Sequence, residues 1–188
     1  MSDRSGATAD GRAGVPAGAG VAEGTQDGSL SADSHGGPGS DRSGSEHPGT
    51  DPVGLLPHRP PFRFVDTVDE LLPGERVVAR YRVTGDEAFL AGHFPGNPVF
   101  PGVIQLEALA QAGAIGLLSL DRYAGTLPLF GGVERVRWRR QVRPGDEMTL
   151  TVDLEKLSTR GGWGSATATV DGKPCCQARL FFVIAPAP

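Results

Sequence analysis

The sequence of 188 residues is poor in aromatic side chains and has only two cysteines, a small net charge and no long apolar run. Its cysteines, Cys175 and Cys176, are adjacent, so they offer neither a disulfide framework nor spaced pairs for zinc. No run reaches the roughly 18 apolar residues that suggest a membrane span. The start, Met1–Gly6, is not followed by the apolar segment of a signal peptide. We therefore expect a cytoplasmic protein with no membrane-embedded part.

The formal net charge of −4 is unevenly distributed along the chain. Residues 1–52 contain eight acidic residues and three arginines, which gives −5. Residues 53–188 contain 14 acidic and 15 basic residues, which gives +1. The nearly neutral part has no bulk electrostatic attraction for nucleic acid, so we expect no nucleic-acid partner.

The first 52 residues also differ from the rest in composition. They hold 12 of the 28 glycines, have no aromatic residue and show no apolar periodicity. Such a segment cannot bury enough surface to offset its loss of conformational entropy. The sequence therefore predicts a disordered tail over residues 1–52, followed by one domain over residues 53–188.

The later part alternates strand patterns with turn residues. Period-two apolar patterns predict strands over the ranges 63–71, 76–84, 127–142, 147–157 and 163–184. Pro73-Gly74 separates the first two ranges, and Asp171-Gly172 divides the last range into a hairpin. A short helical turn is predicted over residues 86–90.

The segment 103–118 is apolar on nearly every face and predicts a buried helix. Its small residues, among them Gly113 and Gly116, would let the helix lie close against a sheet. One long buried helix enclosed by a strongly curved antiparallel sheet is the hotdog fold. We therefore predict an α+β protein of this architecture.

The loop before this helix, with the sequence GHFPGNPVFPGV over residues 92–103, carries the most information about function. Three prolines fix φ and three glycines allow tight turns, so the loop has a preset shape. It holds one imidazole, His93, and the following apolar helix carries one carboxylate, Glu107. A buried carboxylate without a partner is costly, which makes a functional role for Glu107 the favoured interpretation.

The chain resembles the FabZ family of β-hydroxyacyl-acyl-carrier-protein dehydratases in four ordered motifs. The loop is similar to the family's GHFPGxPxxPGV motif. Residues 56–62 resemble its LPHRxPF element, residues 106–111 its helix segment, and residues 136–146 its VRFRxxVxPGD strand and turn. The resemblance covers about residues 53–184. Trp138 departs from the pattern because the family usually has Phe there, and residues 1–52 lie outside it.

This resemblance implies dehydration of 3-hydroxyacyl thioesters on acyl carrier protein to trans-2-enoyl thioesters, in fatty-acid or polyketide-type biosynthesis. It implies the hotdog fold independently. It assigns the catalytic roles to His93 and Glu107, drawn from different subunits of a homodimer, which often assembles into a trimer of dimers. No metal and no cofactor are implied, because the substrate is carried on the phosphopantetheine of the carrier protein.

The residue types suit this chemistry. Histidine side chains titrate near neutrality and serve as bases, while a carboxyl in an apolar wall holds a proton that it can donate. The free N–H groups around Gly102 and Val103, at the helix N-terminus, suit the thioester oxygen. Gly102 lacks a Cβ, which would let the thioester approach. Gln111 lies one turn after Glu107 and is a candidate to hydrogen-bond it.

Two further groups have competing interpretations. The arginines of the 135–143 segment form either an ordinary solvated strand face or a local site for the acidic carrier protein and the phosphate of its phosphopantetheine. The candidate contacts are Arg137, Arg139, Arg140 and Arg143. For His58, a structural hydrogen bond between its ring and the backbone is the favoured interpretation.

Three alternative functions stay open at this stage. A hotdog acyl thioesterase would use the carboxylate to direct water at the carbonyl, although the GHFPGNP loop argues against it. A FabA-type dehydratase-isomerase typically has Asp where this chain has Glu107, and isomerisation is not excluded. A partner subunit without turnover is the weakest alternative, because both candidate catalytic residues are present.

Overall fold

The computed structural model describes residues 51–187. The predicted disordered tail, residues 1–52, lies outside the described residues except for its last two. The helical elements are η1 (Pro52–Leu55), η2 (Ala88–Ala91), α1 (Gly102–Leu118) and η3 (Asp121–Tyr123). The strands are β1 (Thr67–Leu72), β2 (Arg76–Arg82), β3 (Thr126–Trp138), β4 (Glu147–Ser158), β5 (Gly161–Val170) and β6 (Lys173–Pro186).

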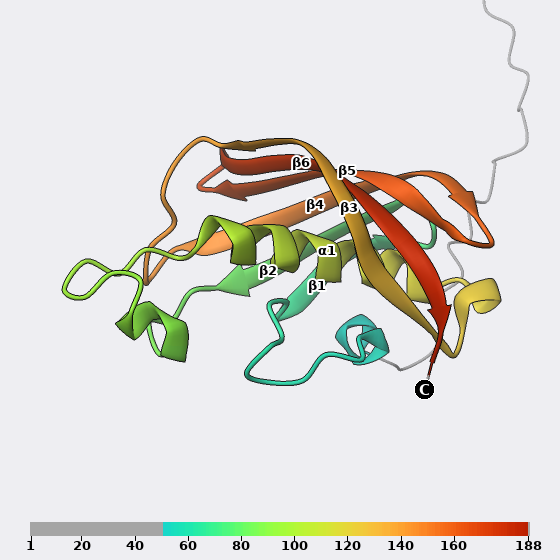
Figure 1. Ribbon diagram of the computed structural model, residues 1–188, viewed down its shortest axis with the longest axis horizontal. Coiled ribbons are helices and arrows are strands. Elements are labelled where there is room, and N and C mark those ends of the chain that lie inside the picture. The colour runs from blue at the N-terminus through green and yellow to red at the C-terminus, as the bar shows by residue number, and fades with distance from the viewer. Residues whose placement is uncertain (1–50, 188) are drawn as a thin grey trace, which may run out of the picture. The chain divides into compact units, whose positions relative to one another are not determined.

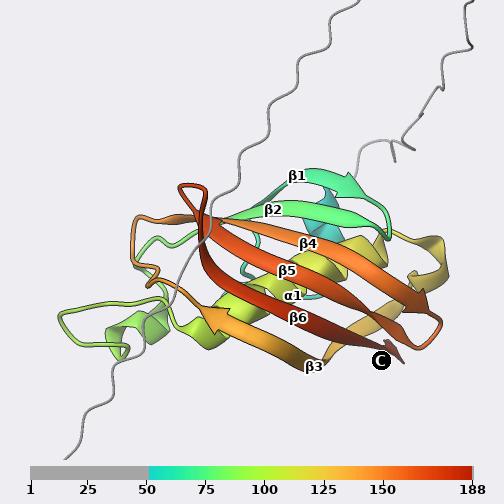
Figure 2. The ribbon, with the colours of Figure 1, turned by 90° about the horizontal axis from the view of Figure 1, so that it is seen from above.

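The strands form one antiparallel sheet of six strands in the order β1-β2-β4-β5-β6-β3. Figure 1 shows the sheet curving over α1, and the view in Figure 2 shows the helix crossing beneath the strands. Strand β3 is an edge strand, because it pairs only with β6. The predicted α+β hotdog fold, with a long central helix in a curved antiparallel sheet, is confirmed.

The helix and sheet are in close contact, as the small residues predicted. A Cβ atom added to Gly113 would lie 2.5 Å from Cζ of Phe182, and one added to Gly116 would lie 2.8 Å from Cγ2 of Val77. Twelve of the 17 residues of α1 are buried. Glycine at these positions therefore sets the distance between the helix and the strands above it.

The turn between β5 and β6 has the predicted hairpin geometry. Asp171 and Gly172 have φ values of 51° and 70°. Positive φ at both central residues is the requirement of a type I′ turn, whose twist matches that of the flanking strands. The Asp-Gly pair therefore ends β5 and starts β6 with the register that the structure shows.

Two predicted strand boundaries differ from the structure by four residues, and the others differ by at most two. Strand β1 begins at Thr67 rather than at residue 63, because the N–H of Phe64 donates to Oε1 of Gln111 on the helix rather than to a strand. Strand β3 ends at Trp138 rather than at residue 142, and Val142 instead accepts a hydrogen bond from the N–H of Phe100. In both segments, contacts with residues distant in the sequence replace the predicted strand pairing.

Among the described helices, none has the length and apolar character needed to cross a membrane.

Candidate active site

The loop before α1 holds His93 by its ring as well as by its backbone. Nδ1 of His93 lies 2.8 Å from the carbonyl oxygen of Val99, and the N–H of Val99 donates to the carbonyl of His93. A carbonyl oxygen only accepts, so Nδ1 carries the proton and Nε2 keeps its lone pair. The ring therefore presents a basic nitrogen in a fixed orientation.

The tip of this loop is a tight turn that explains its glycine and proline. The N–H of Asn97 donates to the carbonyl of Phe94, with Pro95 and Gly96 between them. Gly96 has a φ of 72°, which a type II turn requires at its third position, and proline suits the second. The ring of Phe94 stacks on that of His93, with centroids 4.2 Å apart. The turn thus fixes the residue that covers one face of the imidazole.

The first turn of α1 leaves two backbone donors free beside His93. The N–H groups of Ile104 and Gln105 donate to the carbonyl of Pro101, whereas those of Gly102 and Val103 have no acceptor within residues 51–187. A helix N-terminus carries a partial positive charge, so such free donors attract a negatively charged oxygen. The start of α1 therefore has two free donors and a partial positive charge in the pocket that also holds His93.

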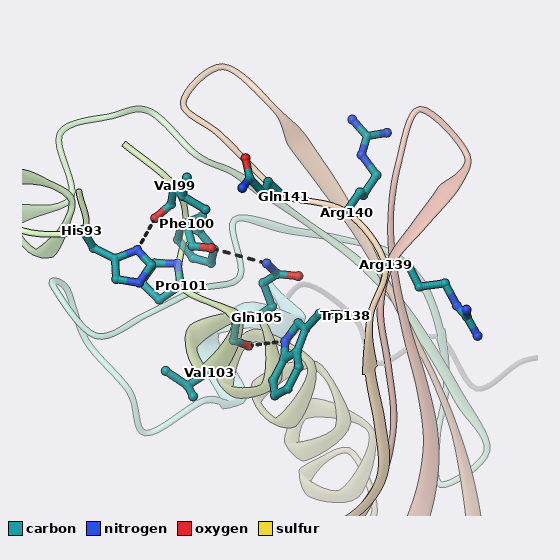
Figure 3. A pocket seen from close by; sticks show the side chains of 11 residues that line it. His93, Val99, Phe100, Pro101, Val103, Gln105, Trp138, Arg139, Arg140 and Gln141 are labelled. Carbon is teal, nitrogen blue, oxygen red and sulfur yellow. Dashed lines mark hydrogen bonds between the residues drawn. The ribbon is translucent and has the colours of Figure 1, made fainter. Parts of the chain in front are cut away.

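His93, Gly102 and Val103 line one pocket of about 560 Å³ (Figure 3). Trp138 forms another part of its wall, and its Nε1 donates to the carbonyl of Gly102 at 2.9 Å. A Cβ on Gly102 would lie 2.6 Å from this nitrogen. The sequence predicted that the missing Cβ leaves room for a thioester, but the indole of Trp138 takes that space.

Glu107 lies further along α1 with a side chain that is 20% exposed. Nε2 of Gln111 donates to Oε1 of Glu107 at 2.9 Å. Gln111 itself is fully buried, accepts from the N–H of Phe64 at 2.7 Å and donates to the carbonyl of Phe62 at 3.1 Å. The amide of Gln111 therefore connects the carboxylate to the extended segment that precedes β1.

His58 is a residue of this site that the sequence interpretation missed. Its Nε2 lies 3.6 Å from Oε1 of Glu107, and its buried Nδ1 has no hydrogen-bond partner within residues 51–187. The expected bond between this ring and the backbone is therefore wrong. The two residues are distant in sequence, and only the LPHR-like motif marked His58 as more than a surface residue.

His93 and Glu107 do not share a pocket within one chain. Glu107 lines a second pocket of about 220 Å³ together with His58 and apolar residues that include Ala110, Ala114 and Phe182. The first pocket, which holds His93, shares none of these residues. The imidazole and the carboxylate therefore face separate cavities of the chain.

The four candidate arginines at the end of β3 and in the segment after it are not one uniform patch. Arg139 and Arg140 line the rim of the His93 pocket, and their guanidinium groups point away from α1 (Figure 3). Arg143 donates instead to Oδ1 of Asn97 at 2.7 Å, so it braces the loop tip. Arg137 donates to its neighbouring carbonyl at Val136. Among the residues described, no guanidinium group of these four arginines lies within 4 Å of a carboxylate oxygen, which leaves their charge available.

Metal ligands are not clustered in the described part of the chain. No group of three or more His, Cys, Asp or Glu side chains among these residues is placed to hold an ion.

Gln105 also lines the His93 pocket, and its buried Oε1 is without a partner within residues 51–187. The polar groups available for chemistry are therefore imidazole, carboxylate, amide and backbone N–H groups.

Comparisons with known proteins identify the family of this chain. A family model for the FabA-like domain matches residues 56–179. The 3-hydroxyacyl-(acyl-carrier-protein) dehydratase FabZ of Oenococcus oeni is 58% identical over 130 residues, which cover 69% of this chain and 94% of that protein. The protein of the same name from Ligilactobacillus salivarius is 52% identical over 130 residues, which cover 69% of this chain and 93% of its own length.

Among solved structures, a chain of the dehydratase heterocomplex ApeI:P from Xenorhabdus doucetiae is similar. The TM-score is 0.61 at 20% identity, and the match covers 73% of this chain and 91% of that chain. At this identity the likeness shows the shared fold alone. The family match and the curated relatives go further: the chain belongs to the FabA-like hotdog family and, within it, to the FabZ-type 3-hydroxyacyl-(acyl-carrier-protein) dehydratases.

Proposed function

We propose that this protein removes water from 3-hydroxyacyl thioesters carried on acyl carrier protein and forms trans-2-enoyl thioesters. The observation that carries the proposal is the imidazole of His93, whose bare Nε2 shares a pocket with the free N–H groups of Gly102 and Val103. A base beside an oxyanion site is what abstraction of a proton next to a thioester carbonyl requires.

In this reaction Nε2 of His93 takes a proton from the carbon next to the thioester carbonyl. The N–H groups of Gly102 and Val103 stabilise the negative charge that develops on the thioester oxygen. Glu107 gives its proton to the 3-hydroxyl group, which leaves as water while the double bond forms between carbons 2 and 3. His93, Glu107 and the backbone N–H groups supply the base, the acid and the oxyanion contacts, and the reaction consumes no oxidant or reductant, so we expect no metal and no cofactor.

Two subunits are needed for this chemistry, because His93 and Glu107 line different pockets of one chain. The free edge of β3 provides a place for a second copy. Apolar side chains on this strand and at the start of α1 are exposed, among them Val103 at 66%, Phe130 at 42% and Trp138 at 50%. A free strand edge with apolar side chains favours pairing with an identical edge. We propose a homodimer, with a trimer of dimers as its further assembly.

Arg139 and Arg140 at the rim of the His93 pocket support a role in binding the carrier protein. Guanidinium groups bind phosphate and carboxylate oxygens well, and a carrier protein presents both. The second pocket, lined by Ala110, Ala114 and Phe182 beside Glu107, suits the apolar acyl chain. We also propose that the reaction belongs to fatty-acid or polyketide-type biosynthesis and that the protein is located in the cytoplasm.

The test is mass spectrometry of 3-hydroxyacyl carrier proteins of graded chain length after incubation with the purified protein. We expect loss of one water from the acyl group and no hydrolysis of the thioester. His93→Ala and Glu107→Gln should each lower turnover by about 10²-fold to 10⁴-fold, the usual contribution of a general acid or base. Glu75→Gln is the matched control, because Glu75 is exposed in the turn before β2.

Each contrary outcome has a definite meaning. Release of free acid in place of water loss would show a thioesterase, and formation of a cis-3-enoyl product would add isomerase activity. Normal turnover in either His93→Ala or Glu107→Gln would contradict the assigned roles. Absence of turnover in the unmodified protein with every chain length would favour a partner subunit without catalysis.

A further inference from the structure

The two carboxylate oxygens of Glu107 have different surroundings. Oε1 accepts from Gln111 at 2.9 Å and faces Nε2 of His58 at 3.6 Å, whereas Oε2 has no partner within residues 51–187. We propose that His58 is a positioning residue for Glu107: with Gln111 it holds Oε1 as an acceptor, so that Oε2 is the oxygen that carries the transferred proton. This inference rests on the proposed function, because it assigns the proton donor within that reaction.

The orientation of the Gln111 amide is fixed by the backbone. The N–H of Phe64 can only donate, so it selects the oxygen of the amide, and the carbonyl of Phe62 can only accept, so it selects the nitrogen. Gln111 therefore has only an N–H group to offer to Glu107. The oxygen that accepts this bond is the carbonyl-type oxygen of the protonated acid, which leaves the proton on Oε2.

The surroundings of the His58 ring determine which of its nitrogens carries the proton. Its Nδ1 is buried without a partner, while its Nε2 faces the carboxylate. A proton on Nδ1 would leave a buried donor unpaired, which is unfavourable, whereas a bare nitrogen at that position loses only an acceptor contact. Neutral His58 therefore carries its proton on Nε2 and directs it at Oε1 of Glu107.

Oε1 of Glu107 has one hydrogen bond, from Gln111, and one longer polar contact of 3.6 Å with Nε2 of His58. Gln111 alone fixes Oε1 at one point and leaves the carboxyl group free to rotate about that contact. His58 approaches from the segment before β1, and its ring stacks on Phe62 with centroids 6.4 Å apart and an angle of 28° between the planes. The second contact therefore restricts the direction in which Oε2 points, which matters for the proton-transfer step more than for substrate binding.

Three substitutions of His58 separate this role from simple packing. His58→Gln places an amide nitrogen near the position of Nε2, His58→Asn places one nearer to Nδ1, and His58→Leu provides no donor. We expect kcat for a 3-hydroxyacyl carrier protein to fall about 10-fold to 100-fold in the Leu and Asn variants, the scale of a small misplacement, with KM nearly unchanged. His58→Gln should recover most of the loss. Arg63→Gln, in the same exposed segment, is the matched control.

Unchanged kcat in His58→Leu would overturn the proposal while leaving the dehydratase function intact. His58→Gln as poor as His58→Leu would also overturn it, because the imidazole itself would then be required. Absence of turnover in the unmodified protein would instead contradict the proposed function.

A second measurement tests the His58 contact without turnover and in the unmodified protein. Long-range ¹H–¹⁵N correlation spectra should show the proton of His58 on Nε2 and that of His93 on Nδ1, each signal assigned by its substitution. These are opposite tautomers. Observation of the proton of His58 on Nδ1 would overturn the proposal even if the variants did not fold.

Discussion

Gly113 offers the sharpest test of how α1 and the sheet together shape the pocket that holds Glu107, the proposed acyl pocket. In Gly113→Ala the new Cβ would lie 2.5 Å from Cζ of Phe182 and 3.3 Å from Cγ1 of Val152. Carbon atoms pack at about 3.5 Å, so the ring must move by about 1 Å. Phe182 is 1% exposed and lines the pocket that holds Glu107, so this movement displaces part of the pocket wall, and we expect it to leave less room for the acyl chain.

The change in stability is the difference between two opposing effects. Overpacking of a well-packed core costs about 1 to 3 kcal/mol, while alanine is favoured over glycine in a helix by about 1 kcal/mol. We expect a net loss of about 1 kcal/mol in the free energy of unfolding. For a domain of this size the melting temperature should then fall by about 4 °C. Calorimetry or chemical denaturation measures both quantities.

Gly116→Ala is the matched control for activity, because its Cβ would meet Val77 at 2.8 Å and Leu154 at 2.9 Å, away from the pocket. Both variants should be destabilised, but only Gly113→Ala should shift turnover toward shorter acyl chains. Each methylene that no longer fits is worth about 0.8 kcal/mol, or about a fourfold change in kcat/KM. An equal shift in both variants, or unchanged stability in Gly113→Ala, would refute the reasoning.

Three further predictions concern other parts of the molecule. Gly102→Ala should destabilise the protein because its Cβ would lie 2.6 Å from Nε1 of Trp138, and Trp138→Ala should remove much of this penalty in a double-mutant cycle of melting temperatures. Burial raises the pKa of Cys176 to about 12 from its ordinary 9.0. The free energy of unfolding should therefore fall as pH rises above about 9, because only the unfolded thiol ionises there. Cys176→Ala should reduce this pH dependence, measured by denaturation at pH 8 and pH 10. A chain that starts at Asp51 should keep the kcat and melting temperature of the full chain, and loss of either would give the first 50 residues a role.

Patterns local in the sequence predicted most of the fold. The apolar run over residues 103–118 and the turn at Asp171-Gly172 depend on interactions between near neighbours, and both are present in the structure. The sequence predicts the segment 63–66 as part of a strand because Phe64 and Val65 are apolar, and both side chains are indeed buried. Its hydrogen bond goes to Gln111, 47 residues later, which no local pattern contains.

In the candidate site, too, local motifs predicted some residues, while contacts between residues distant in the sequence were missed. The loop motif marked His93, and the isolated carboxylate in an apolar helix marked Glu107. The contact of His58 with Glu107 joins residues 49 positions apart, and the indole of Trp138 over Gly102 joins residues 36 positions apart. Such contacts follow from the tertiary fold. They explain why the sequence interpretation assigned His58 to the backbone and the space beside Gly102 to substrate.

Mixing two inactive variants tests the central claim most directly, namely that His93 of one subunit works with Glu107 of another. His93→Ala and Glu107→Gln are combined in equal amounts under conditions of demonstrated subunit exchange. Half of the dimers are then mixed, and each mixed dimer holds one intact and one doubly altered site, so about a quarter of the wild-type sites return. The account predicts recovery of about a quarter of wild-type dehydration. No recovery despite exchange, or a fully active monomer in sedimentation, would contradict it.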